Sequence, residues 1–187
     1  MVKKKLVVID LDHTLIGVDS FRFYINKKIK NGSFYALILK WLRRFRFIRL
    51  EDFKKYTIRL ILEEDPELNN LTGNLTSFLN EPLLNKLKSE FVGDEFELLI
   101  LSASPDNYVR ILGERLQINA KGSHFENDTK TFMHIHGKGK IDYLLHHFPK
   151  DTYNYEYAIS DSITDEKLLS LFKKSELIEP FKIKDAK

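Results

Sequence analysis

The 187-residue chain contains no cysteine, and this absence excludes disulfide bonds, thiolate metal ligands and cysteine nucleophiles. Any bound metal ion must therefore be held by oxygen or imidazole groups. A chain without cysteine also suits a reducing compartment, so we expect a cytoplasmic location.

Long apolar segments are absent as well. The apolar stretch that follows the basic N-terminus covers residues 6–9 and is ended by Asp10, so no export signal is evident. The longest uninterrupted apolar run in the most basic region, residues 34–39, has six residues, whereas a membrane-spanning helix needs about 20. We therefore expect a protein that is soluble or at most peripheral at a membrane.

Acidic residues are scarce in one part of the chain. Residues 20–60 contain twelve Lys and Arg against two Asp and Glu, a charge of 12 − 2 = +10, while the whole chain carries +3 and the remainder therefore 3 − 10 = −7. One interpretation is a docking face for anionic lipid headgroups, with aromatic side chains entering the interface. The other is that the aromatic side chains pack inside and the charges form a solvated face or attract phosphorylated substrates. The aromatic residues concerned are Phe34, Tyr35, Trp41, Phe45 and Phe47. No recognition motif accompanies the charge, so nucleic-acid binding is not expected.

Three short apolar segments end in polar residues. They cover residues 6–10, 96–101 and 155–159 and alternate with helical patterns over residues 82–91, 105–116, 140–147 and 165–172. Alternation of this kind predicts an α/β fold with a parallel sheet between two helical layers. Residues 131–135 alternate weakly, and we expect a small hairpin with residues near His124. Ligands in such sheets bind at the carboxyl ends of the strands.

Residues 17–80 interrupt this alternation with helical spacing throughout. We expect a catalytic core formed by residues 1–16 and 81–187, with residues 17–80 as an inserted helical subdomain. Two of its helices are predicted over residues 34–45 and 51–63. On the first, an apolar face is formed by Phe34, Leu37, Ile38, Trp41 and Phe45.

Carboxylates at the strand ends predict phosphoryl-transfer chemistry. Asp10 and Asp12 follow the first strand, so Asp10 can attack phosphorus while Asp12 protonates the leaving oxygen and later deprotonates water. The charge that accumulates calls for a cation, and Mg²⁺ suits carboxylate and phosphate oxygens. Asp161, after the third strand, is the predicted metal ligand. An isolated Asp-x-Asp pair is more often a turn or a helix cap, so the prediction depends on the whole set.

Other polar residues complete the predicted site. Ser102 and Thr14 offer donors to the phosphoryl oxygens, and Lys138 in the Gly-Lys-Gly-Lys segment offers a positive charge. Asp165 could orient Lys138 or a metal-bound water. That segment alone would be read as a solvated loop. The paired histidines His134 with His136 and His146 with His147 lack a complete ligand set, so no zinc site is expected.

The combination of these motifs resembles the haloacid dehalogenase superfamily of phosphatases, in the branch similar to phosphoserine phosphatase. The resemblance covers essentially the whole chain and implies a Rossmann-like core with a helical cap between the first two motifs. It implies Asp10 as nucleophile and Asp12 as acid/base. It also implies Mg²⁺ ligands from the Asp10 and Asp161 carboxylates and the Asp12 backbone carbonyl. Ser102 would bind phosphate together with Lys138, for which Lys140 is the rival.

The sequence departs from this pattern in two places. The last motif usually reads Gly-Asp-x-x-Asn-Asp, and here residues 160–165 read Ser-Asp-Ser-Ile-Thr-Asp, which keeps both acids. The cap arginine that holds the carboxylate of phosphoserine has no clear match, because Thr57 aligns there. Asp19 matches an acidic residue at the cap entry and is a candidate for substrate contact.

A looser similarity is to class C phosphatidylglycerophosphate phosphatases, carried by Ser-Ala-Ser-Pro at residues 102–105 and by residues 157–162. It implies a lipid phosphate and a cap at the membrane. The sequence thus predicts a Mg²⁺-dependent phosphomonoester hydrolase for a small phosphorylated metabolite or a lipid phosphate. The alternatives are a noncatalytic protein of this fold that binds a membrane or partner, and a phosphotransferase or mutase with the same aspartyl-phosphate. The oligomeric state is not predicted.

Overall fold

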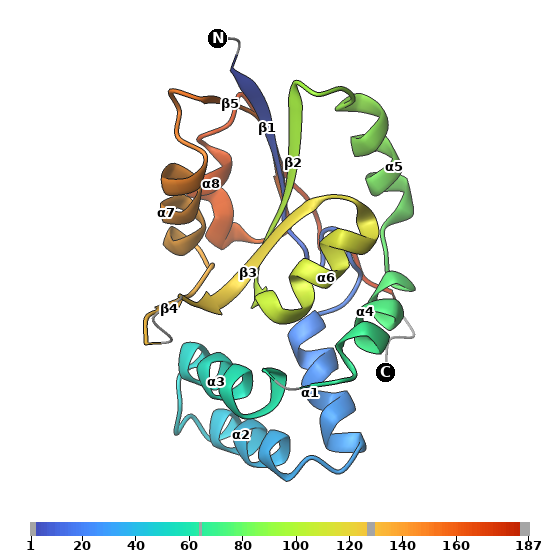
Figure 1. The fold of residues 1–187 in the computed structure, drawn as a ribbon, viewed down its shortest axis with the longest axis vertical. Coiled ribbons are helices and arrows are strands. Elements are labelled where there is room, and N and C mark those ends of the chain that lie inside the picture. The colour runs from blue at the N-terminus through green and yellow to red at the C-terminus, as the bar shows by residue number, and fades with distance from the viewer. Residues whose placement is uncertain (1–2, 64, 127–129, 184–187) are drawn as a thin grey trace.

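The computed structural model describes residues 3–63, 65–126 and 130–183. A six-stranded sheet in the order β4-β3-β2-β1-β5-β6 forms its centre (Figure 1). All neighbouring strands are parallel except β3 and β4. The strands are β1 (Lys4–Ile9), β2 (Phe96–Pro105), β3 (Asn119–Phe125), β4 (Phe132–Met133), β5 (Tyr153–Ser160) and β6 (Lys174–Leu177).

Strand β1 is apolar on both faces because both faces are covered. Val7 and Ile9 belong to one buried cluster, whereas Leu6 and Val8 belong to another on the opposite face. A parallel strand between two helical layers needs such a continuous apolar run, since alternate side chains enter different cores. The predicted three-layer α/β fold is confirmed.

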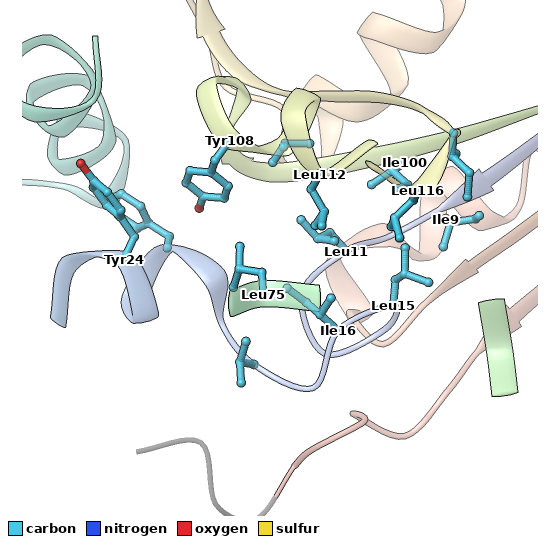
Figure 2. Close-up of a cluster of buried hydrophobic side chains, with 14 of the residues drawn as sticks. Ile9, Leu11, Leu15, Ile16, Tyr24, Leu75, Ile100, Tyr108, Leu112 and Leu116 are labelled. Atoms are coloured by element: carbon cyan, nitrogen blue, oxygen red, sulfur yellow. The ribbon is translucent and has the colours of Figure 1, made fainter. Parts of the chain in front are cut away.

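Helices cover the two faces of the sheet separately. The first core receives side chains from α4 (Leu68–Thr76), α5 (Glu81–Glu90) and α6 (Asp106–Leu116). The second receives them from α7 (Lys138–His147) and the short α8 (Glu166–Leu169). Figure 2 shows Leu116 of α6 beside Ile9 and Leu112 beside Leu11 in the loop after β1, with Tyr108 on the side toward Tyr24. These contacts hold that loop, which carries the first site residues, against the core.

The remaining helices lie between β1 and α4 in the sequence. They are α1 (Ser20–Lys30), α2 (Phe34–Arg44) and α3 (Leu50–Thr57), which continues directly into a π-helical turn at Ile58–Leu62. In Figure 1 they form a group beyond the carboxyl ends of β1 and β2, while α4 packs against α6. The boundaries of residues 17–80 as a separate subdomain stay a prediction.

The predicted elements agree with the structure in type and differ at their ends. β3 and β4 form the expected small hairpin, with His124 opposite Met133. Pro105 ends β2 instead of opening the next helix, and the helix expected over residues 165–172 is a 3₁₀ turn (Ile163–Asp165) followed by α8. Strand β6 was not predicted, because its four residues are all exposed and carry no apolar pattern. No helix of the described residues has the length and apolar composition that a membrane span requires.

Candidate active site

Asp10 lies at the carboxyl end of the central strand. Its backbone N–H donates to the carbonyl oxygen of Ile159, which continues the pairing of β1 with β5 for one residue past the strand. The pairing registers Ile9 with Ile100 of β2 and with Ile159 of β5. The strand ends therefore bring Asp10, Ser102 and Asp161 to one edge of the sheet, as the sequence predicts.

A buried lysine joins two of the carboxylates. The Lys140 ammonium group donates to Asp10 Oδ1 at 2.5 Å and to Asp165 Oδ2 at 2.6 Å. The side chains of Lys140 and Asp165 are 3% and 2% exposed, and Asp165 Oδ2 also accepts from the Ser160 hydroxyl at 2.8 Å. Burial lowers the pKa of Lys140, but attraction to the two aspartates outweighs it and raises that pKa overall. Lys140 is therefore a fixed positive charge beside Asp10.

The structure places Lys140, and not Lys138, beside Asp10. The Lys138 side chain is 84% exposed and its ammonium group pairs with Asp142, one turn along α7, at 2.6 Å. It points away from Asp10 because positions 138 and 140 lie on different sides of the first helical turn. The glycine between them has a steric cause: a Cβ at position 139 would overlap the carbonyl oxygen of His134. The Gly-Lys-Gly-Lys segment thus starts α7 close to β4 and directs Lys140 inward.

Asp12 is held by groups from two other elements. Its Oδ2 accepts from the Ser104 hydroxyl at 2.6 Å, and its Oδ1 accepts from the backbone N–H of Ser20 at 2.9 Å. Burial raises the pKa of Asp12, and proximity to Asp19 acts in the same direction. Burial likewise raises the pKa of Asp10 to about 6, against the opposing effect of Lys140. Raised pKa values favour the protonated forms, which suits Asp12 as a proton donor.

Thr14 connects the first and last motifs. Its buried hydroxyl accepts from the backbone N–H of Asp161 at 2.9 Å and lies 3.3 Å from both Asp10 Oδ2 and Asp161 Oδ1. The side chain is fully buried and does not line the cavity described below. The hydroxyl therefore positions the two carboxylates, and its predicted role as a donor to phosphoryl oxygens stays a prediction.

Replacing Thr14 with valine tests this positioning role. The change keeps the shape and leaves the Asp161 N–H without its acceptor, so we expect a loss of about 1–3 kcal/mol in the free energy of unfolding. Denaturant titration measures it. Thr76→Val, which removes a hydroxyl that donates to the carbonyl oxygen of Gly73 near the end of α4, serves as the control with an expected change within about 0.5 kcal/mol. Equal, small effects of both variants would contradict the role assigned to Thr14.

A cavity of about 300 Å³ collects the polar side chains. Asp10, Asp12 and Asp161 line it, together with Ser102 and Lys140. The Ser102 hydroxyl is buried and accepts from the backbone N–H of Ser104 at 3.1 Å, which leaves its own proton for a ligand. A larger cavity, of about 1140 Å³, lies at the amino ends of the strands beside Lys4, Phe96 and Asn119 and contains none of the buried carboxylates.

Asp19 lies at the edge of the same cavity. Its Oδ1 accepts from the backbone N–H of Arg22 at 2.8 Å and so caps the N-terminus of α1. One carboxylate oxygen remains for a ligand. The role of Asp19 in substrate contact stays a prediction.

Lys54 is a residue of this cavity that the sequence did not single out. It comes from α3, is 5% exposed, and donates to the carbonyl oxygen of Ala103 at 2.6 Å. Burial lowers its pKa to about 8. His134 lies 3.5 Å away, and burial and the Lys54 charge lower the pKa of that histidine to about 4. Lys54 lies three residues before Thr57, the position that aligns with the cap arginine of phosphoserine phosphatases, and residues three apart share a helix face.

The donor set fits a magnesium ion. Asp10 Oδ2 and Asp161 Oδ1 converge, since both lie within 3.3 Å of the Thr14 hydroxyl. Two carboxylates with a backbone carbonyl, waters and substrate oxygens suit Mg²⁺, which retains part of its hydration shell. No group of three or more His, Asp or Glu side chains in the described ranges is arranged to hold a metal by itself. The Asp10 and Asp161 carboxylates thus supply part of the ligand set of such an ion.

Comparison with known proteins gives the family. Residues 7–170 match the haloacid dehalogenase-like hydrolase family, so the chain belongs to that family. The expectation of a haloacid-dehalogenase-type enzyme is confirmed. No curated protein matches the sequence.

Solved structures share the fold at low sequence identity. A Bordetella pertussis Tohama I protein of unknown function superposes with a TM-score of 0.70 at 15% identity, over 93% of this chain and 89% of the other. A substrate-bound phosphoserine phosphatase gives 0.58 at 16% identity, over 96% and 89%. A phospho-aspartyl intermediate analogue of phosphoserine phosphatase gives 0.54 at 14% identity, over 95% of both chains. The fold is therefore phosphatase-like.

Proposed function

We propose that this protein hydrolyses phosphomonoesters through an aspartyl-phosphate on Asp10, with Mg²⁺ as cofactor. The observation that carries the proposal is the position of Asp10: a buried carboxylate beside the Lys140 ammonium group, on the wall of a cavity that Asp12 also lines. A noncatalytic binding protein has no need of a second carboxylate held in place by Ser104 and Ser20.

Two displacement steps follow from this geometry. In the first, an oxygen of Asp10 attacks phosphorus, the ester P–O bond breaks, and Asp12 gives its proton to the leaving oxygen. In the second, Asp12 takes a proton from water, the water oxygen attacks phosphorus, and the bond between phosphorus and Asp10 breaks. Inorganic phosphate leaves and Asp12 is again protonated, so the cycle closes.

Charged groups around the phosphoryl position support both steps. Lys140 and the Ser102 hydroxyl offer positive charge and a hydrogen-bond donor to the phosphoryl oxygens. The Asp10 and Asp161 carboxylates and the Asp12 carbonyl would hold Mg²⁺, which supplies further neutralisation of charge on the transferring group. Asp165 fixes the Lys140 ammonium group through the 2.6 Å contact.

The substrate class is a small phosphorylated metabolite or a lipid phosphate. Lys54 lies on the cavity wall across from the strand ends and has no carboxylate within ion-pair distance among the described residues. A buried ammonium group that reaches a cavity favours a substrate with an anionic group near the phosphate ester or the phosphate itself.

Lys54→Met separates this binding role from a structural one. Burial lowers the pKa of Lys54 from 10.5 to about 8, so burying the charged form costs folding free energy. This cost is complete below pH 8 and disappears as the pH rises from 8 to 10.5. Methionine carries no charge to bury, so we expect the free energy of unfolding at pH 7 to rise by about 1–3 kcal/mol. We expect KM to rise at least tenfold. Calorimetry and steady-state kinetics measure the two effects.

The matched variant Lys54→Arg keeps the charge at all accessible pH values. It should retain a low KM above pH 8, where the KM of the natural protein rises. A KM that is unchanged in Lys54→Met would contradict the proposed contact with substrate.

A substrate panel tests the proposed function. Purified protein with magnesium is assayed for phosphate release from small phosphomonoesters and from lipid phosphates in mixed micelles, with EDTA-treated protein alongside. Activity that disappears with EDTA and returns with magnesium supports the proposal. Phosphate release that EDTA does not change would contradict the metal requirement.

A further inference from the structure

Helix α2 turns an aromatic face to solvent. The buried side chains of this helix are Ala36 and Leu39. Phe34, Trp41 and Phe45 are 68%, 54% and 54% exposed. The apolar face that the sequence predicts for this helix is thus mostly exposed to solvent. The alternative in which these aromatic side chains pack inside is wrong for all five residues that it concerns.

Three of these aromatic side chains form one cluster. The Trp41 ring centre lies 4.6 Å from that of Phe45 and 5.8 Å from that of Phe47, which is itself 67% exposed. Soluble proteins rarely expose contiguous apolar patches of this kind without a partner. We call this cluster, with Phe34 and Tyr35, the aromatic face.

Positive charge predominates around the aromatic face, although the acidic Asp52 pairs with Arg49 at 3.5 Å. Residues 20–50 contain nine Lys and Arg and no Asp or Glu. Arg44, Arg46 and Arg49, which adjoin the cluster in the sequence, are exposed. An interface with a second copy through this face would oppose like charges across the whole contact, which costs binding energy.

We propose that the aromatic face docks on an anionic lipid bilayer. Aromatic rings are the side chains that settle at the boundary between headgroups and acyl chains, and neighbouring Lys and Arg gain from anionic headgroups. An eleven-residue helix can lie in that boundary with its apolar side inward. The excess of positive charge favours an anionic bilayer over a zwitterionic one.

A basic groove beside α2 adjoins the active-site cavity. A groove of about 590 Å³ is lined by Lys40, Arg43, Arg44 and Arg46, and Asp19, Phe21 and Leu50 line both this groove and the site cavity. An anionic headgroup can therefore lie among the arginines with a phosphate ester directed to Asp10. This part rests on the proposed phosphatase function, whereas docking itself does not.

Trp41 is the one tryptophan of the chain and reports on docking directly. Asp10→Asn protein is titrated with vesicles of phosphatidylglycerol and phosphatidylcholine, with pure phosphatidylcholine vesicles, and in low and high salt. We expect a blue shift of Trp41 emission with anionic vesicles. The apparent affinity for neutral vesicles should be at least tenfold lower, and the shift with anionic vesicles should disappear in high salt. Binding by a variant that does not turn over separates docking from catalysis.

Paired variants locate the surface. Phe45→Ser with Phe47→Ser keeps Trp41 as probe, and Arg44→Glu with Arg46→Glu removes charge; each should weaken vesicle affinity at least tenfold. The matched controls are Val92→Ser with Leu145→Ser and Lys167→Glu with Lys174→Glu, which change exposed residues elsewhere and should bind as the natural chain does.

Three results would overturn docking. They are no Trp41 shift with anionic vesicles, equal losses in the control variants, and a blue shift that depends on protein concentration without vesicles, which indicates a second copy on the aromatic face. Phosphate release from soluble esters without any vesicle shift would leave the proposed function intact and reject docking alone. A blue shift of Trp41 emission with vesicles but no turnover on any substrate would support docking and reject the proposed function.

Discussion

Asp10→Asn is expected to lower kcat/KM by at least about 10⁴-fold, because a carboxamide cannot form the acyl phosphate that both steps require. The substitution keeps the size of the side chain, and Lys140 retains Asp165 as its partner at 2.6 Å. The fold should therefore survive. Steady-state kinetics on the best substrate of the panel measures the effect, and circular dichroism checks the fold.

Asp12→Asn provides the comparison for this result. It removes the proton donor but leaves the nucleophile, so the first step should slow by about 10²–10⁴-fold. A substrate with a good leaving group, which needs no proton, should recover much of the rate of formation of the intermediate. Turnover by Asp10→Asn at more than a few per cent of the natural rate would contradict the assignment of Asp10 as nucleophile.

Lys140→Met has the second large expected effect, on both activity and stability. The change leaves Asp10 and Asp165 buried without their shared cation, and breaking a buried pair costs about 3–5 kcal/mol. The pKa of Asp10 is already raised to about 6, so Asp10 can take up a proton when the cation is removed. We therefore expect a cost at the lower end of that range. We also expect kcat to fall by about 10²–10³-fold, since charge on the phosphoryl group loses its fixed partner.

Lys138→Met is the matched control, two residues away on the same helix. The Lys138 side chain is 84% exposed and pairs with Asp142 on the same helix, so the variant should change the free energy of unfolding by less than about 0.5 kcal/mol. Its kcat should be that of the natural chain. If Lys138→Met lost activity and Lys140→Met kept it, the placement of the lysine in the site would be wrong.

Part of the site could be predicted because strand ends are visible in the sequence. Residues 6–9, 98–101 and 157–159 are apolar, and each run is ended by a polar residue: Asp10, Ser102, and Ser160 next to Asp161. Parallel pairing then brings the ends together without further information. The edge strand β6 has no such pattern, because all four of its residues are exposed and none has to be apolar to pack in a core.

Other features depended on tertiary contacts that no local pattern contains. The choice between Lys138 and Lys140 is set by where α7 begins, which in turn depends on close packing of Gly139 against His134. Lys54 reaches the site only because α3 lies beyond the strand ends. The stripe on α2 was recognised as apolar, but periodicity cannot say whether such a stripe meets a core or an external partner.

A rapid-quench experiment tests the central claim most directly. The protein is mixed with magnesium and a reactive phosphate ester such as para-nitrophenyl phosphate, quenched in acid within one turnover, and reduced with borohydride, which converts an acyl phosphate to an alcohol. Peptide mass spectrometry should then find homoserine at position 10 and unaltered aspartate at positions 12, 161 and 165. Phosphate release without any modification at Asp10, or with modification at another aspartate, would contradict the account.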